Sequence, residues 1–408
     1  MRILYFSEFY KPERIASAFR ASEHAKYWVD SGHELTVFTD FPHYPAGKLI
    51  GSYTLQRYTE EFLDGVRVVR NKSIIESNRS LIKRAIGGIS FLWYGWINSR
   101  NKHLLNPSAY DVVLATSGTV FSAWVGMRFA RRNHLPLVVE IRDLTYKQMV
   151  ATGSSESSIK VRIMKLIELY LCRVADYVVP LTNSFSSELV KEGISAEKMI
   201  VVPNGADFVP CDHIGSEILH FGYFGTLGIS QNVAGTLRML SSVAGYSDLP
   251  FVYTLIGEGA CREELQQLIA QEDYSFASLR SGMSPDELEP YYAQVDMTVV
   301  SLQKSESFAG TVPSKLFQSW ARGVPVLFIG PEGEAAQLVR ASGAGIALCG
   351  TDDEDKQALR AFMEQSNLCN VLSDMRMRAG AFMKENFARR KMAEKMLSVL
   401  ERAAEVAR

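Results

Sequence analysis

Short runs of β-branched and aromatic residues alternate along this chain with longer amphipathic stretches, and this alternation limits the possible folds more than any other feature. The first run is Ile3–Phe6, the amphipathic stretch Phe19–Ser31 follows it, and further runs occur at Leu35–Thr39, Val66–Val69, Val112–Ala115, Leu137–Ile141 and Tyr177–Leu181. Strands separated by helix-length segments are typical of βαβ units, so the pattern predicts a doubly wound parallel sheet.

The alternation pauses across Ala206–Glu217, a polar stretch with Pro210 and Gly215 that we interpret as a linker. It then restarts, with predicted strands at Leu219–Phe224, Phe251–Ile256, Ala277–Arg280, Met297–Leu302, Val324–Ile329 and Gly345–Leu348. The last stretch, Lys384–Arg408, has a continuous helical pattern and no strand after it.

The predicted fold is therefore α/β, with two Rossmann-like domains whose parallel sheets face a central cleft. We expect the domains at residues 1–205 and 206–384, a hinge near residues 203–217, and a C-terminal helix over residues 385–408 that packs back on the first domain. A chain of 408 residues is long enough for two domains. In such folds ligands bind at the carboxyl ends of the strands.

Composition excludes several classes of protein. The 44 Lys and Arg residues against 45 Asp and Glu leave a net charge of −1, which provides no general attraction for nucleic acid. The five cysteines are odd in number and form no CxxC pair, so we expect reduced thiols and no structural zinc. The sequence MRILYFSEFYKPE lacks the apolar region of a signal peptide, and no apolar run is long enough to span a membrane, which favours a cytoplasmic location.

The strongest local motif is Gly310–Gln318, which follows a predicted strand and opens a helix. No P-loop, GxSxG, HExxH or GxGxxG motif occurs in the chain. At such a helix start, free N–H groups favour a phosphate, Ser314 adds a hydroxyl and Lys315 adds a cation. Pro313 suits the first helical turn. The alternative is an ordinary capped helix with a solvent-facing lysine.

Two charged residues, Arg142 and Asp143, directly follow the predicted buried strand Leu137–Ile141. At that position the arginine could contact a phosphate or an acceptor, and the aspartate could orient a hydroxyl group. The alternative is an internal ion pair that fixes a loop. We expect His33 and His43 to have structural roles in loops.

The segment Asn78–Leu105 departs from the alternation. It contains many apolar and aromatic residues, including Trp93 and Trp96, beside the cations Arg79, Lys83, Arg84, Arg100 and Lys102. This combination is typical of a helix that lies in a membrane interface on anionic lipid. The alternative is a buried helix of the first domain with charged ends.

Several motifs occur in an order that resembles one known family. They are Tyr10–Glu13, Ser31–Val37, Phe41–Gly47, Asp64–Arg70, Glu140–Leu144, Val202–Asp207, Val312–Gln318 and Gly333–Ala336. In order and spacing they resemble the GT-B glycosyltransferases of family four, particularly bacterial members similar to the N-acetyl-L-fucosamine transferases of surface-polysaccharide assembly.

The resemblance implies that the two domains bind different substrates. The second domain would bind the nucleotide sugar, through Gly225, Thr226, Gly257, Glu258, Met283, Pro313, Ser314, Lys315 and Gln318. The first would present the acceptor, with Arg142 and Asp143 acting beside Lys315 in catalysis and with a loop that contains Ile15, Ala16 and Ser17 near the acceptor or the diphosphate. A capping box that begins at Ser284 would fix the turn that carries Met283.

Four departures from the family pattern concern the proposed binding sites. Gln318 replaces the glutamate that usually receives the ribose hydroxyls, and Gly310 replaces its partner glutamate. The loop Arg14–Ser17 has no glycine, and the segment Thr226–Asn232 lacks the usual Arg/Lys pair. Lys315 would then be the main cation that faces the leaving phosphate.

The expected function is that of a retaining, metal-independent glycosyltransferase of the hexosyl or N-acetylhexosaminyl type. It would transfer a sugar from a UDP-sugar to a lipid-linked or oligosaccharide acceptor on the inner face of the cytoplasmic membrane, in O-antigen, capsule or exopolysaccharide assembly. No cofactor and no metal are expected, since Asp352–Asp355 is predicted to be a solvated helix start rather than a metal-binding pair.

Two other functions remain open from the sequence. A UDP-sugar 2-epimerase has two similar domains but has no use for an apolar and basic surface such as Asn78–Leu105. A non-catalytic nucleotide-sugar-binding subunit is favoured by the departures at Gln318 and Ile15.

Overall fold

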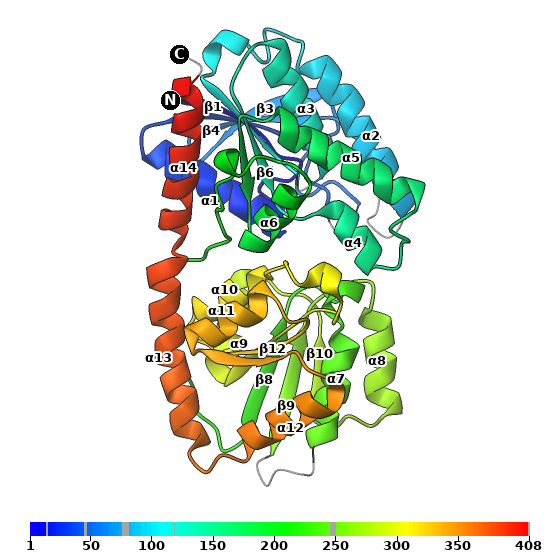
Figure 1. Ribbon diagram of the computed structural model, residues 1–408, viewed down its shortest axis with the longest axis vertical. Coiled ribbons are helices and arrows are strands. Elements are labelled where there is room, and N and C mark those ends of the chain that lie inside the picture. Colours follow the sequence, from blue (N-terminus) through cyan, green and yellow to red (C-terminus); the bar gives the residue numbers. More distant parts are fainter. Residues whose placement is uncertain (14, 45–46, 76–80, 118, 245–249, 407–408) are drawn as a thin grey trace. The chain divides into compact units, whose positions relative to one another are not determined.

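The structure is a computed structural model that describes residues 1–408 except 14, 45–46, 76–80, 118, 245–249 and 407–408. The chain forms two compact units (Figure 1). The first unit comprises Met1–Tyr146, Glu156–Asn204 and Arg389–Arg408, and the second comprises Lys147–Ser155 and Gly205–Ala388. Each unit is an α/β fold built on one sheet.

The first unit has a seven-stranded sheet in the order β3-β4-β2-β1-β5-β6-β7. The strands are β1 (Arg2–Phe6), β2 (Glu34–Asp40), β3 (Tyr58–Leu63), β4 (Val66–Asn71), β5 (Val112–Thr116), β6 (Leu137–Ile141) and β7 (Tyr177–Pro180). All pairs are parallel except β3 with β4. The sequence did not predict β3, because this edge strand carries two glutamates and none of its side chains is fully buried.

Helices cover both faces of this sheet (Figure 1). On one face lie α1 (Ala16–Asp30) and α14 (Arg389–Val406), and on the other lie α2 (Leu81–Asn98), α3 (Val120–Arg132) and α5 (Ile159–Val174). The helix α6 (Asn183–Lys191) follows β7. The indole of the buried Trp28 donates a hydrogen bond of 3.0 Å to the carbonyl oxygen of Ala393, which fixes α14 against α1.

The second unit has a six-stranded parallel sheet in the order β10-β9-β8-β11-β12-β13. Its strands are β8 (Leu219–Phe224), β9 (Phe251–Ile256), β10 (Ala277–Arg280), β11 (Met297–Ser301), β12 (Val326–Ile329) and β13 (Gly345–Leu348). One core contains α7 (Val233–Val243), α8 (Arg262–Gln271) and α12 (Asp352–Met363). The helices α10 (Ser314–Trp320), α11 (Glu334–Ser342) and α13 (Leu368–Asn386) share another core, and α9 (Pro285–Gln294) contacts β8.

One expectation about a connection is wrong. The predicted continuous helix from Lys384 is interrupted, because α13 ends at Asn386 and α14 begins at Arg389. Between them Phe387 is buried against Phe317 in the second unit, with ring centroids 4.9 Å apart. The stretch interpreted as a linker contains neither helix nor strand. It is hydrogen-bonded along the second unit, since Val209 N donates to Ala321 O and Ile214 N donates to Ala293 O, both at 2.8 Å.

Two local predictions are confirmed. Ser284 opens α9 with a capping box, in which its hydroxyl and the Glu287 carboxylate each bond the other's backbone N–H. The acidic run Asp352–Asp355 forms the first turn of α12, although Asp355 itself is buried beside Lys304 at 2.7 Å. Both features are helix N-termini that complete their own hydrogen bonding.

Candidate functional site

The turns that follow β8, β9 and β10 bring several predicted donor-site residues together at the carboxyl edge of the second sheet. Gly225 and Thr226 follow β8, and Gly257 and Glu258 follow β9. Gly225 N donates to Ile256 O at 2.9 Å, and Leu227 N donates to Glu258 O at 2.9 Å. The Glu258 carboxylate accepts a 3.0 Å hydrogen bond from the N–H of Gly282, next to Met283. These bonds fix the three turns to one another.

Two glycines allow this close approach. A Cβ atom at Gly257 would lie 1.9 Å from the carbonyl oxygen of Gly225, so no side chain fits there. Gly225 has a φ of +134°, which side-chain-bearing residues rarely adopt, and a Cβ there would lie 2.5 Å from Cε of Lys315. The Lys315 side chain is therefore held directly against the Gly225 turn.

The environment of Lys315 is unusual for a lysine. Its Nζ lies 5.1 Å from the ring centroid of Tyr223, and none of the ion pairs among the described residues includes it. Burial lowers the pKa of Lys315 to about 8. A partly desolvated amine without a carboxylate partner is well suited to bind an anion.

The helix α10 carries the other residues predicted beside Lys315. Pro313 is its N-cap, Ser314 is its first residue, and the half-buried Gln318 lies one turn further along. Arg322 holds the end of the helix, donating to the carbonyl oxygen of Gln318 at 3.0 Å and forming an ion pair with Glu289. With seven residues, α10 has a short dipole, so the charge of Lys315 is the stronger attraction for an anion.

In the first unit, the structure brings Arg142 to the start of α1. Its Nη2 donates to the carbonyl oxygen of Ala16 at 3.3 Å, next to Ile15, the N-cap, and Ser17. Arg142 is 8% exposed, and its Nη1 is buried with no hydrogen-bond partner in the part of the chain that the structure describes. A buried guanidinium with an unused N–H can bind a phosphate or hydroxyl oxygen.

Behind Arg142 lies a buried ion pair that the sequence analysis did not assign. Arg20 Nε lies 2.8 Å from Glu140 Oε1, and the same guanidinium donates to the carbonyl oxygens of Val202 and Pro203. Burial alone would raise the pKa of Glu140, but the charges of Arg20 and Arg142 lower it to about 2. The sequence feature that could have indicated this ion pair is Glu140, a charged residue inside the predicted buried strand Leu137–Ile141. Asp143 follows this strand and is half-buried.

A group of acidic residues at the ends of β1 and β2 was also missed. Burial raises the pKa of Glu8 to about 7 and that of Asp40 to about 8. Glu13 accepts hydrogen bonds of 3.0 Å from the N–H groups of His43 and Tyr44. The ring of His43 is bonded to the carbonyl oxygen of Phe41 at 2.8 Å, while burial lowers the pKa of His33. Neutral carboxyl groups at this edge could both donate to and accept from sugar hydroxyls.

Comparison with known proteins agrees with this architecture. Residues 17–205 match the family described as "Glycosyl transferase 4-like domain". Sucrose-phosphate synthase from Thermosynechococcus elongatus has the same fold at 13% identity, with a TM-score of 0.75 over 99% of both chains. The chain has the GT-B fold of family-four glycosyltransferases, and residues 17–205 match that family's domain. The fold class predicted from the sequence is thus confirmed, and the predicted family is matched over residues 17–205.

Two further proteins that are similar to this chain bear on its function. This chain is 23% identical over 388 residues to WcaI of Escherichia coli (strain K12), which is named as a colanic acid biosynthesis glycosyl transferase. The aligned region covers 90% of this chain and 92% of WcaI. HepE of Anabaena, solved in complex with UDP, is 15% identical with a TM-score of 0.67, covering 98% of this chain and 100% of HepE. The closer similarity to N-acetyl-L-fucosamine transferases stays a prediction.

The described residues contain neither a membrane-spanning helix nor a cluster of metal ligands. None of their helices is long and apolar enough to cross a membrane. Over the same residues, no three His, Cys, Asp or Glu side chains gather closely enough to hold a metal ion.

Proposed function

We propose that the protein is a family-four glycosyltransferase that takes its sugar from a UDP-sugar bound at the carboxyl edge of the second sheet. The observation that carries the proposal is the Lys315 amine, held without an ion-pair partner against the Gly225 turn. HepE, a protein of the same fold, was solved with UDP, which supports this choice of nucleotide. The sugar would be of the hexosyl or N-acetylhexosaminyl type.

The chemistry expected of this site is stabilisation of a leaving diphosphate. As the bond to the sugar breaks, negative charge grows on the β-phosphate, and the Lys315 ammonium and Ser314 hydroxyl would stabilise it. Because a fixed cation supplies this stabilisation, we propose a metal-independent reaction. Gln318 would bond the ribose hydroxyls, while Thr226, Gly257, Glu258 and the turn at Met283 would line the rest of the nucleotide sugar.

We further propose that the first unit presents the acceptor, with retention of anomeric configuration. The unused N–H of Arg142 and the start of α1 at Ile15–Ser17 would bind an acceptor or diphosphate oxygen, and Asp143 would orient the reacting hydroxyl. The acceptor would be a lipid-linked sugar or an oligosaccharide in surface-polysaccharide assembly, which the name of WcaI supports. A lipid-linked acceptor would place the protein at the inner face of the cytoplasmic membrane.

The test is incubation of the purified protein with UDP-sugars, with and without a membrane extract. UDP release that depends on the extract, together with loss of release in Lys315→Met, would support the proposal. An epimerised UDP-sugar would identify a 2-epimerase instead. Tight UDP binding without turnover on any acceptor would identify a non-catalytic nucleotide-sugar-binding subunit.

A further inference from the structure

The helix α2 exposes a row of apolar side chains on its outer side. Ile86, Ile89, Trp93 and Trp96 follow one another at intervals of three or four residues, and Ile89 and Trp93 are each 60% exposed. Its inner side packs on α3, where Gly88 meets the ring of Phe121. The segment that the sequence analysis singled out is thus both a core helix and an exposed apolar surface, with Asn78–Ser80 outside the described residues.

A second apolar row lies on α5. Ile159, Ile163, Leu166 and Tyr170 are spaced four, three and four residues apart, and Ile159 and Leu166 are 76% and 62% exposed. Since α3 packs against both α2 and α5, it lies between the two apolar rows. We refer to the exposed side of these three helices as the α2–α3–α5 face.

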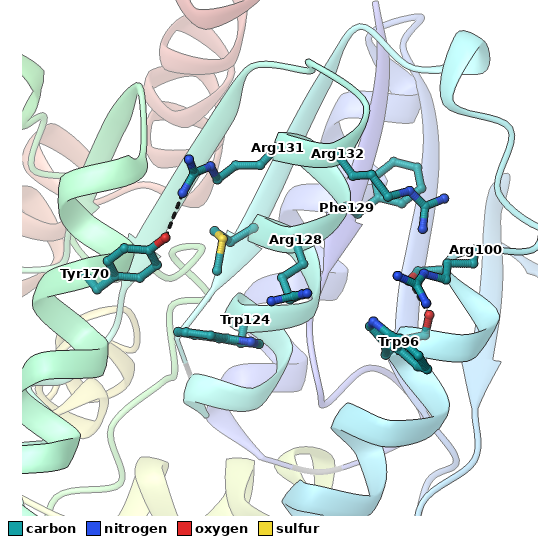
Figure 2. Close-up of a pocket in the computed structure, with 10 residues that line it drawn as sticks. Trp96, Arg100, Trp124, Arg128, Phe129, Arg131, Arg132 and Tyr170 are labelled. Atoms are coloured by element: carbon teal, nitrogen blue, oxygen red, sulfur yellow. Dashed lines mark hydrogen bonds between the residues drawn. The ribbon is translucent and has the colours of Figure 1, made fainter.

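Between the rows is a pocket of about 340 Å³ (Figure 2). Four arginines line it: Arg100 after α2, and Arg128, Arg131 and Arg132 on α3. The Arg100 guanidinium lies 3.9 Å from the ring centroid of Trp96, and Arg131 Nη1 donates to the Tyr170 hydroxyl at 2.7 Å. Aromatic side chains therefore hold two of the four cations in place.

Lys165 of α5 is paired with Glu192, but the four pocket arginines have no acidic partner on the three helices. The only Asp or Glu in α2, α3 and α5 is Glu168, which is buried and accepts from the N–H groups of Thr145 and Tyr146. None of the four pocket arginines belongs to an ion pair recorded among the described residues. A cluster of positive charge thus remains available to an anionic partner.

We propose that the α2–α3–α5 face docks on an anionic phospholipid bilayer and that the arginine pocket receives a lipid phosphate. Guanidinium groups match phosphate oxygens in pairs, and a basic surface gains about 1 kcal/mol per cation near anionic lipid. The two apolar rows need a medium that removes them from water, which the acyl boundary supplies at the depth where tryptophan is favoured. Only the biological role of this docking rests on the proposed function, since docking would bring the enzyme to a lipid-linked acceptor.

Vesicle flotation with the full-length protein tests the proposal. Vesicles of phosphatidylcholine alone are compared with vesicles that also contain phosphatidylglycerol, at low and high salt. The key variant is Arg128→Gln with Arg132→Gln. Its matched control is Lys395→Gln with Arg402→Gln, two exposed cations on α14, which packs on the opposite face of the same sheet. A third variant, Ile163→Ser with Leu166→Ser, tests the apolar row on α5.

We expect the wild-type protein to bind the anionic vesicles, more weakly at high salt. Loss of two arginines should weaken binding by about thirtyfold, while the α14 control should bind like wild type. The Ile163 and Leu166 variant should also bind more weakly, and thermal melting should show that all three variants fold.

Several outcomes would overturn the proposal. Equal binding to neutral and anionic vesicles would show that the lipid's negative charge has no role. If the α14 control lost as much binding as the variant of Arg128 and Arg132, the attraction would come from the overall charge of the protein and not from the pocket. No binding to anionic vesicles at low salt would leave the face to an acidic protein partner. UDP affinity, measured by calorimetry on the same samples, separates this test from the proposed function, since failure of UDP binding would leave vesicle binding unaffected.

Discussion

The Lys315 amine should make UDP affinity depend on pH in a way that this one residue controls. Burial lowers its pKa to about 8 in the unliganded protein. The amine is then about 90% protonated at pH 7 and about 10% protonated at pH 9. A bound diphosphate favours the protonated form of the Lys315 amine. At pH 9 the amine must therefore take up a proton when UDP binds, whereas at pH 7 it already carries that proton.

The size of the effect follows from these fractions. If the amine stays protonated in the complex, UDP affinity should fall about tenfold between pH 7 and pH 9, which is about 1.4 kcal/mol. Lys315→Met removes the charge but keeps most of the side-chain length beside Gly225. It should weaken binding at pH 7 by about 1.5–3 kcal/mol, the range for a charge-assisted hydrogen bond.

Isothermal titration calorimetry across this pH range measures both quantities. Any ionisation of UDP itself appears equally in the Lys315→Met protein, so the difference between the two pH profiles belongs to the lysine. Buffers of different ionisation enthalpy would count the proton taken up at pH 9. Identical affinities and identical pH profiles in the two proteins would refute the assignment of Lys315 to the diphosphate.

Three further predictions concern other residues. Gln318→Leu should cost about 1–3 kcal/mol of UDP affinity in calorimetry because ribose hydroxyls lose their partner, whereas Gln318→Glu should bind like wild type. Gly257→Ala should destabilise the second unit by about 1–3 kcal/mol in denaturant unfolding, because the new Cβ would meet the Gly225 carbonyl oxygen; an unchanged midpoint would contradict the packing described. Burial holds the pKa values of Glu8 and Asp40 at about 7 and 8, so the folded protein keeps protons that the unfolded chain releases near pH 4. The free energy of unfolding should therefore fall as pH rises from about 5 to 8, and Asp40→Asn should flatten that profile.

Local patterns were enough to predict most of the fold. The buried strands, such as β5 and β6, are continuous apolar runs, and a parallel sheet covered on both faces requires such runs. The edge strand β3 was missed because it is polar and pairs antiparallel with its neighbour β4. The break between α13 and α14 was missed because helical periodicity continues across Phe387, whose burial in the second unit depends on tertiary packing.

The candidate site was only partly predictable, for a related reason. Motifs marked Gly225 and Lys315 separately, but their contact joins residues 90 positions apart and depends on the sheet order. The ion pair of Arg20 with Glu140 and the apolar row on α5 have no motif at all. Periodicity shows that a helix has an apolar row, whereas only packing shows whether that row faces the core or water.

The position of α14 has a consequence for how the protein is made. Its Met396, Val399 and Leu400 are part of the same core as β1 and β5, although roughly 180 residues of the second unit separate it from the rest of the first. At about 5–20 residues per second, a ribosome needs roughly 10–40 s to synthesise that intervening stretch. Throughout that interval the nascent first unit exposes an apolar surface to water, so this half of the chain is the one that we expect molecular chaperones to bind during translation.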